Sequence, residues 1–227
     1  MSATYTAGAN TLKKIEGGYC PGGYTCGSAE SGETYRGIDR GKQPLWIGWK
    51  LIDAYKRRYG APKTFTYFAG TDGRAIDIEV EKFWSSWWNG WGFSLLKNQF
   101  MAELLYTWSA QGPNRAIRNI NEIGKKYGAQ IFSSSKITPD VANAINNNLA
   151  KAYQDARNTI ITWYKENRKN DYQKFIESRV NIFPVFIGNV ISTPGTPIKP
   201  PAASTTTSSN SFLGWLAGLF SLASIYR

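Results

Sequence analysis

Histidine is absent from this chain of 227 residues. The imidazole ring is the general base of Ser-His-Asp and Cys-His sites, so both forms of nucleophilic catalysis are excluded. Zinc peptidase and zinc amidase chemistry is excluded for a related reason, since it relies on imidazole ligands. Any acid–base catalysis in this chain therefore has to use other side chains, of which carboxylates are the most common.

Cysteine is scarce, with only Cys20 and Cys26, six positions apart across a Pro-Gly-Gly segment. Two thiols without histidine make a poor zinc site. We therefore expect neither a metal nor another cofactor. A disulfide could tie this loop if the protein works outside a reducing compartment. Two free thiols fit the sequence equally well, so the pairing stays open.

Acidic residues are outnumbered, at 16 against 27 Lys and Arg, which gives a formal net charge of +11. A basic protein is attracted to nucleic acid and equally to anionic bacterial wall polymers, and positive charge also favours solubility. The basic residues are spread along the chain without a basic run or a nucleic-acid-binding motif. We expect no nucleic-acid partner.

Long apolar runs are missing too. Residues 1 to 12 contain no apolar core or cleavage site, so no signal peptide is expected. Residues 193–210 are rich in Pro, Ser and Thr and predict a flexible linker. The final segment, 211–227, is apolar from Phe212 to Tyr226 but too short to span a bilayer, which takes about 20 apolar residues. It predicts a membrane or virion contact, as an interfacial anchor or a docking helix, or alternatively a tail that folds back.

The most informative motif is Glu-Gly-Gly-Tyr at 16–19, followed by Gly32, Thr34, Gly37 and Ile38. Residues 7 to 16 predict a short helix, and residues 20 to 38 predict a glycine-rich loop and β-hairpin. Glu16 would thus be held at a helix end, and glycines would let the hairpin approach without side-chain clash. Glycosidic bond cleavage needs such a protonatable carboxyl, together with a polar group across the sugar.

These residues resemble the N-terminal half of glycoside hydrolase family 108, the N-acetylmuramidases of phages and bacteria. The resemblance continues through residues 44–53 and a second block from Phe83 to Ala116, and covers about residues 10 to 185. It implies a lysozyme-type muramidase that hydrolyses the β-1,4 bond between N-acetylmuramic acid and N-acetylglucosamine in bacterial peptidoglycan. Without a signal peptide, such an enzyme would be virion-associated, or released from the host cytoplasm to the periplasm and wall.

The resemblance also implies the catalytic residues. Glu16 is expected to keep its proton near neutral pH and donate it to the leaving oxygen. The family has an aspartate before its threonine, but none lies between Glu16 and Thr34 here. Glu30 lies nearest to that position and is our candidate for the second carboxylate, with Glu33 as the alternative. Thr34 would position the attacking water, with an inverting outcome.

Four residues are predicted to contact the substrate, namely Tyr19, Glu33, Tyr35 and Trp88. Trp88 belongs to a cluster with Trp84, Trp87 and Trp91, which share one face at helical spacing. Flat aromatic faces stack on sugar rings, but they also fill protein cores. The sequence leaves both interpretations of this cluster open.

Hydrophobic periodicity predicts a mainly helical α+β protein, with a lysozyme-like domain and a small glycine-rich β-hairpin. The expected helices cover residues 7–16, 46–59, 76–88, 93–108, 114–127 and a long one that starts at Thr138-Pro139 and continues to Tyr164. We expect residues 1–70 to form an N-terminal catalytic lobe and residues 71–192 a helical, peptidoglycan-associated lobe. Two other functions fit this sequence, namely a catalytically inactive peptidoglycan-binding protein and a structural virion protein.

Overall fold

The computed structural model describes residues 2–22, 32–168, 170, 172–187 and 190–191. Contacts between residues group Met1–Pro194 as one unit and Gly195–Arg227 as another. The expected linker after residue 193 and the apolar tail lie outside the described residues, as do Glu30 and Cys26. Their roles stay predictions.

The described residues form a mainly helical α+β unit with a small antiparallel hairpin, which confirms this part of the expected fold class. The helices are α1 (Tyr5–Ile15), α2 (Gly48–Tyr59), α3 (Gly70–Trp91), the 3₁₀ helix η2 (Phe93–Leu95), α4 (Gln99–Ser109), α5 (Pro113–Lys126), α6 (Pro139–Asn147), α7 (Leu149–Asn167) and α8 (Tyr172–Arg179). Two hairpins complete the list, with β1 (Thr34–Tyr35) paired to β2 (Ile38–Asp39), and β3 (Phe186–Ile187) paired to β4 (Val190–Ile191).

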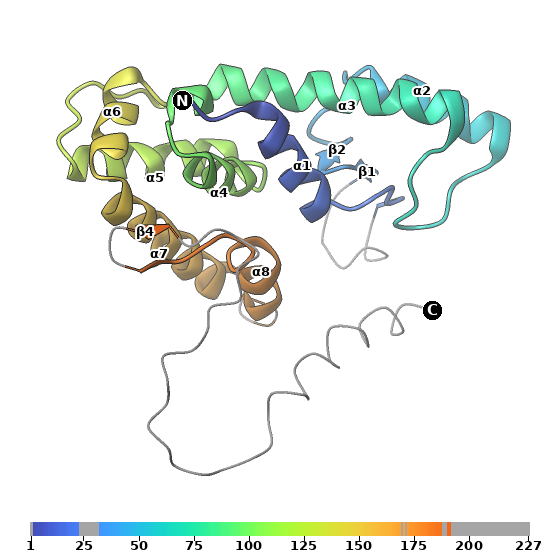
Figure 1. Ribbon diagram of the computed structural model, residues 1–227. Helices are drawn as coiled ribbons and strands as arrows, with labels where there is room; N and C mark the ends of the chain where they lie inside the picture. Colours follow the sequence, from blue (N-terminus) through green and yellow to red (C-terminus); the bar gives the residue numbers. More distant parts are fainter. Residues whose placement is uncertain (1, 23–31, 169, 171, 188–189, 192–227) are drawn as a thin grey trace, which may run out of the picture. The chain divides into compact units, whose positions relative to one another are not determined.

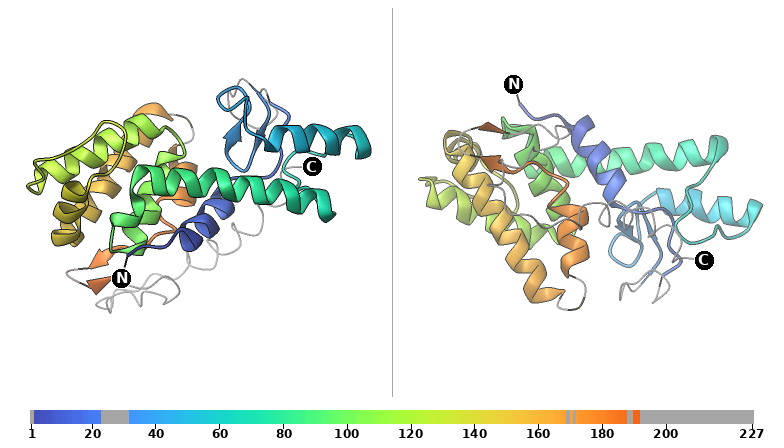
Figure 2. Two further views of the ribbon diagram at one scale, coloured as in Figure 1. Left: turned by 90° about the horizontal axis from the view of Figure 1, so that it is seen from above. Right: turned by 60° about the horizontal axis from the view of Figure 1, so that its bottom comes forward.

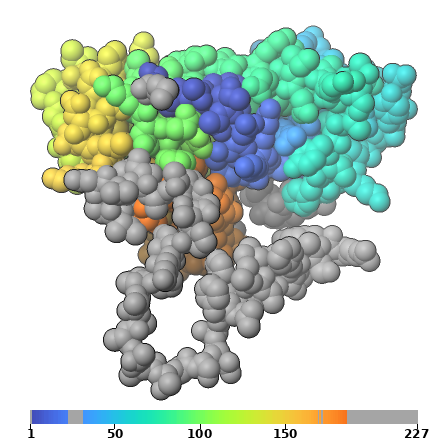
Figure 3. Space-filling model, in the orientation of Figure 1, coloured from blue at the N-terminus to red at the C-terminus, as the bar shows by residue number. Residues whose placement is uncertain are grey.

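Helix α3 is the longest of the described elements, and α1 and α2 lie beside it (Figure 1). Helices α1 and α2 both pack against α3, and the view from above shows them on its two sides (Figure 2). Helices α4 to α7 gather near the end of α3. Helix α1 also packs on α4, so that residues from distant parts of the sequence form one continuous surface (Figure 3).

The predicted glycine-rich hairpin is present. Thr34 pairs with Asp39 and Tyr35 with Ile38, which leaves two residues in the turn. Both turn residues have positive φ, 51° for Arg36 and 76° for Gly37, as a type I′ turn requires.

Local capping signals explain which helix boundaries the sequence predicts correctly. Helix α6 starts as expected, with the Thr138 hydroxyl accepting from Val141 N at 3.3 Å and proline in the first turn. The long helix expected beyond it is wrong, because the chain leaves the helical conformation at Asn148. Asparagine side chains compete with the backbone for hydrogen bonds, and the Asn148 amide donates to Ala144 O at 3.0 Å.

Helix α3 starts at Gly70, earlier than the expected Ile76. The segment around Asp72 and Gly73 is therefore helical rather than an irregular polar stretch. Asp72 in the first turn suits the helix dipole. A residue with a side chain would not fit at position 73, since a Cβ there would lie 2.4 Å from Phe68 O.

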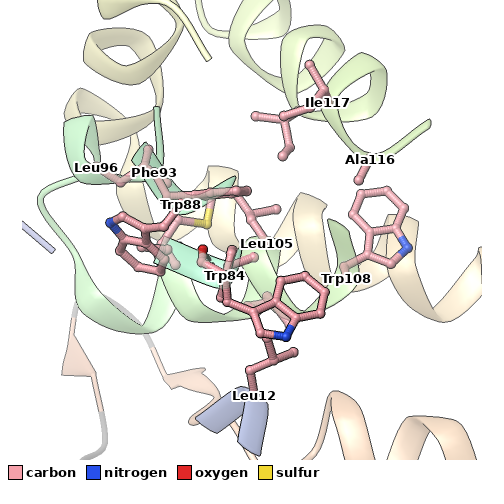
Figure 4. Packing of buried hydrophobic residues seen from close by; sticks show 14 of the residues in the cluster. Leu12, Trp84, Trp88, Phe93, Leu96, Leu105, Trp108, Ala116 and Ile117 are labelled. Atoms are coloured by element: carbon pink, nitrogen blue, oxygen red, sulfur yellow. Dashed lines mark hydrogen bonds between the residues drawn. The ribbon is translucent and has the colours of Figure 1, made fainter. Parts of the chain in front are cut away.

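The hydrophobic core joins α1, α3, α4 and α5 (Figure 4). From α3, Trp84 and Trp88 are buried, whereas Trp87 and Trp91 are only partly buried at the edge of the core. The shared tryptophan face is thus a packing face, with its outer members at the rim. None of the helices in the described part of the chain is long and apolar enough to cross a membrane.

Candidate active site around Glu16

Glu16 caps the C-terminal end of α1, where its backbone N–H donates to Leu12 O at 2.8 Å. Its side chain is only 11% exposed. Oε1 accepts hydrogen bonds from Arg179 Nη1 at 2.6 Å and from Gln111 Nε2 at 3.0 Å. The carboxylate is therefore anchored by α8 and by the segment after α4, both far away in sequence.

The other side of the Glu16 carboxylate faces the hairpin turn. A Cβ on Gly37 would lie 2.8 Å from Glu16 Cγ and 3.0 Å from Oε2, so only glycine fits this contact. Oε2 accepts no hydrogen bond from another described residue. The expected geometry, a carboxylate at a helix end beside a tight bend, is confirmed, with one oxygen fixed and the other available.

A cavity of about 270 Å³ lies beside this carboxylate. Its walls come from the hairpin, from α3 and from the segment after α4. They consist of Gly37, Ile38, Asp39, Lys42, Gln43, Phe83, Trp84, Trp87, Ala110, Gln111, Gly112 and Pro113. Glu16 is not itself one of the lining residues, but Gly37 and Gln111 both line the cavity and contact it, so its carboxylate lies directly behind this wall.

Helix α8 holds Arg179 in place through packing on α7. Phe175 stacks on Tyr164 with ring centroids 5.3 Å apart, and the Arg179 guanidinium lies 5.7 Å from the Phe175 ring. Burial raises the pKa of Tyr164 to about 12; the Arg179 charge opposes this shift and the Glu16 charge adds to it. Tyr164 is thus a neutral phenol beside the Glu16–Arg179 ion pair.

Three of the four residues predicted to contact the substrate are buried in this structure. Tyr19, Tyr35 and Trp88 are 2%, 0% and 1% exposed, so none of these rings can stack on a sugar. Trp88 packs so closely on α1 that a Cβ on Gly8 would lie 2.5 Å from its ring. These aromatic residues fill the core instead.

The hydroxyl groups of the two buried tyrosines each donate a hydrogen bond to a carboxylate. Tyr35 donates to Asp77 Oδ1 at 3.0 Å, and burial together with the Asp77 charge raises its pKa to about 12. Tyr19 donates to Glu33, and burial followed by that hydrogen bond raises its pKa as well.

Glu33, the fourth predicted contact, is held in an ion network. Both of its oxygens are occupied by donors from Tyr19, Arg40 and Lys56, and Arg40 also makes two hydrogen bonds to Asp53, at 2.8 and 2.7 Å. Burial alone would raise the pKa of Glu33, but these donors outweigh it and lower the pKa. The network joins the hairpin to α2, so neither substrate contact nor the role of second carboxylate fits Glu33.

The remaining residues named from the sequence are Thr34, Glu30 and the two cysteines. Thr34 is half-buried, exchanges two backbone hydrogen bonds with Cys20, and lies opposite Asp39. Glu30, our candidate for the second carboxylate, lies outside the described residues. Cys20 is disulfide-bonded, and the only other cysteine of the sequence, Cys26, lies outside the described residues.

Sequence reasoning missed Gln111, Arg179 and Asp39. Asp39 lines the cavity and is 6% exposed. It could have been found from the hairpin, because a two-residue turn at 36–37 pairs position 34 with position 39. Arg179 gives no local signal, since it lies 163 positions from Glu16.

Within the described ranges, no group of three or more Cys, Asp or Glu side chains is placed to hold a metal ion. A scan against models of protein families finds no match to this chain, and searches of curated proteins and of solved structures find no significant one.

Proposed function

We propose that this protein is a peptidoglycan muramidase with Glu16 as its general acid. The bond broken would be the β-1,4 bond between N-acetylmuramic acid and N-acetylglucosamine. The observation that carries this proposal is the position of Glu16, a nearly buried carboxylate with one oxygen that accepts no hydrogen bond, held by two residues that line a cavity. The likeness of the Glu-Gly-Gly-Tyr and Gly-x-Thr-x-x-Gly-Ile segments to family 108 adds to it.

The contacts of Glu16 suit proton donation to a sugar oxygen. Gln111 and Arg179 fix Oε1, so the carboxyl group has one orientation, and Oε2 is the oxygen that would carry the proton. Because Gly37 carries no side chain, the turn packs directly against the carboxyl and helps to hold it in place. A positioned acid of this kind accelerates a reaction by roughly 10²–10⁴-fold.

One observation favours the alternative function, a peptidoglycan-binding protein without hydrolysis. The Glu16 carboxylate is in an ion pair with Arg179 Nη1 at 2.6 Å, and both side chains are nearly buried. This contact joins α1 to α8 and needs no catalytic role to explain it. A binding protein without hydrolysis would keep it for stability.

Replacing Glu16 with glutamine tests the proposal and separates the two functions. Glu16→Gln keeps an oxygen that can accept from Arg179 but removes the acid. We expect the unaltered protein to release fragments with N-acetylmuramic acid at the reducing end from purified peptidoglycan, as read by mass spectrometry. The rate of fragment release by the variant should be at least 100-fold lower.

Glu177→Gln is the matched control, because Glu177 is an exposed glutamate on α8 with one hydrogen bond, from Gln173. It should retain full activity, and circular dichroism should show both variants folded. Binding to peptidoglycan without released fragments from the unaltered protein would support the alternative. Equal activity of Glu16→Gln, or N-acetylglucosamine at the reducing ends, would contradict the proposal.

A further inference from the structure

Asp39 is a buried carboxylate whose two oxygens have different partners. Oδ1 accepts from Gly41 N at 2.7 Å and from Lys42 N at 3.2 Å, which closes the turn after β2. Oδ2 is buried and accepts no hydrogen bond within the described part of the chain. Oδ2 makes one long ion pair, at 3.7 Å, with Lys42 Nζ, whose side chain is 74% exposed.

A buried carboxylate oxygen without a hydrogen bond is unfavourable and is rare in folded proteins. The turn itself needs only Oδ1, for which asparagine would serve equally well. Oδ2 therefore has no structural role that its hydrogen bonds explain. Asp39 lines the cavity, but Oδ2 is closed to water in this structure, with the Lys42 side chain beside it. A water molecule in the cavity would become the donor to Oδ2 once this exposed lysine side chain moves away.

The hairpin places three useful groups together. Thr34 and Asp39 are direct partners across the two strands, so their side chains project from the same face. The turn between them contacts the Glu16 carboxylate through Gly37. The hairpin therefore brings a hydroxyl and a second carboxylate to the region of the proposed acid.

Other carboxylates near the hairpin are already engaged. Glu33 and Asp53 share the guanidinium of Arg40, and Asp77 accepts from the Tyr35 hydroxyl. Among the described residues that line the cavity, Asp39 is the one with a carboxylate.

We propose that Asp39 is the second carboxylate of this site and acts as the base that activates the attacking water. This inference rests on the proposed muramidase function. Glycosidases of the inverting type use one carboxylic acid and one carboxylate in this way. Asp39 thus takes the role for which the sequence had suggested Glu30.

The proton balance assigns one step to each carboxylate. Glu16 gives its proton to the glycosidic oxygen as the bond from C1 of the muramic acid residue to that oxygen breaks. The water oxygen forms the new bond to C1, and its proton passes to Asp39 Oδ2. Glu16 ends ionised and Asp39 protonated, and exchange with solvent restores both.

Asp39→Asn is the decisive variant, since it keeps the acceptor at Oδ1 and removes the base at Oδ2. We expect at least a 100-fold loss in the rate of fragment release with an unchanged unfolding temperature. Asp140→Asn is the matched control, because Asp140 also accepts from two backbone amides with one oxygen, those of Gln130 and Ile131. It does not line the cavity and should leave the rate unchanged.

Azide gives a readout that a merely structural role would not produce. In Asp39→Ala, sodium azide should restore fragment release and yield a glycosyl azide, because azide attacks C1 without a base. If this variant does not fold, Asp39→Asn decides. An active unaltered protein with an equally active Asp39→Asn overturns the role of Asp39 alone, as does a folded Asp39→Ala that azide does not rescue. An inactive unaltered protein overturns the proposed function, and the role of Asp39 falls with it.

Discussion

Glu16 and Glu33 lie on either side of the same loop but have different partners. Glu16 accepts with a single oxygen from Arg179 and Gln111 and lies directly behind the cavity wall. Glu33 uses both oxygens to join the hairpin to α2, through Tyr19, Arg40 and Lys56. We therefore propose a catalytic role for Glu16 and a role in stability for Glu33, whose lowered pKa should couple folding to pH.

Glu33→Gln should lower the free energy of unfolding by about 2 kcal/mol at neutral pH, because the donors around Glu33 lose a charged acceptor. The pKa of Glu33 is lowered in the folded protein, so its contribution is fully present above the unfolded value of about 4.5. It is lost as the pH falls through the lowered folded value. Urea unfolding of both proteins at neutral and acidic pH should show the difference shrinking with acid.

The control is Glu122→Gln, which changes an exposed glutamate that pairs with the neighbouring Lys125 alone. An exposed pair of this type contributes little, so the free energy of unfolding should change by less than about 0.5 kcal/mol. A stability difference for Glu33→Gln that stays constant from neutral to acidic pH would contradict the assignment of Glu33.

Among single residues, the sequence predicts the placement of Glu16 at a helix end beside a bend, because the information is local: a helix end followed by two glycines. It does not predict the burial of Tyr19, Tyr35 and Trp88, since residue type alone does not tell which face of an element is covered by others. It cannot predict Arg179, whose contact with Glu16 exists only once α8 packs on α7.

At the scale of secondary structure, the β1–β2 hairpin is the element that organises the site. Its type I′ turn needs positive φ at both central residues, and Gly37 supplies one of them at 76°. The same glycine contacts Glu16, and Asp39 at the end of β2 lines the cavity. Turn conformation and carboxylate position are therefore coupled.

Gly37→Ala should abolish fragment release as well as lower stability. Its Cβ would meet Glu16 Cγ at 2.8 Å and displace the carboxylate. Positive φ adds a cost of about 1–2 kcal/mol. Steady-state rates on peptidoglycan and urea unfolding should show both effects.

Gly60→Ala separates the effect of backbone strain at positive φ from the effect of a contact with Glu16. Gly60 has φ of 83°, but a Cβ there would meet nothing within 4 Å. This variant should lose similar stability and keep its activity. Equal rates for Gly37→Ala and Gly60→Ala would show that the contact with Glu16 is unimportant.

Some helix boundaries can be predicted from the residues at the boundary, and others cannot. The starts of α5 and α6 are readable from Pro113 and from Thr138-Pro139. The break at Asn148 and the early start of α3 at Gly70 involve contacts that are also close in sequence, Asn148 with Ala144 and Gly73 with Phe68, but whose geometry shows only in the folded chain. Helix α8 was not predicted, since it is short and its order comes from contacts such as Phe175 on Tyr164.

At the scale of the whole chain, contacts group residues 1–194 separately from 195–227. The core residues, the cavity and the Glu16 contacts all belong to the first group. Folding and chemistry should therefore need only this first unit.

A chain that ends at Pro194 should unfold within about 2 °C of the full chain and release fragments from purified peptidoglycan at the same rate. A lower unfolding temperature would instead support the alternative in which the tail folds back onto the rest. If the shortened chain binds lipid vesicles or phage particles less than the full chain, the tail is the anchor that its composition predicts.

Trp84 connects the cavity to the hairpin in a way that is useful beyond catalysis. Its indole Nε1–H donates to Arg36 O at 3.0 Å, and its ring forms part of the cavity wall although it is only 3% exposed. A molecule that enters the cavity should therefore change the polarity around this ring. Trp87 also lines the cavity, so the contribution of Trp84 is the emission change or indole nuclear magnetic resonance signal that a Trp84→Phe variant lacks. That contribution makes Trp84 a built-in spectroscopic reporter of occupancy.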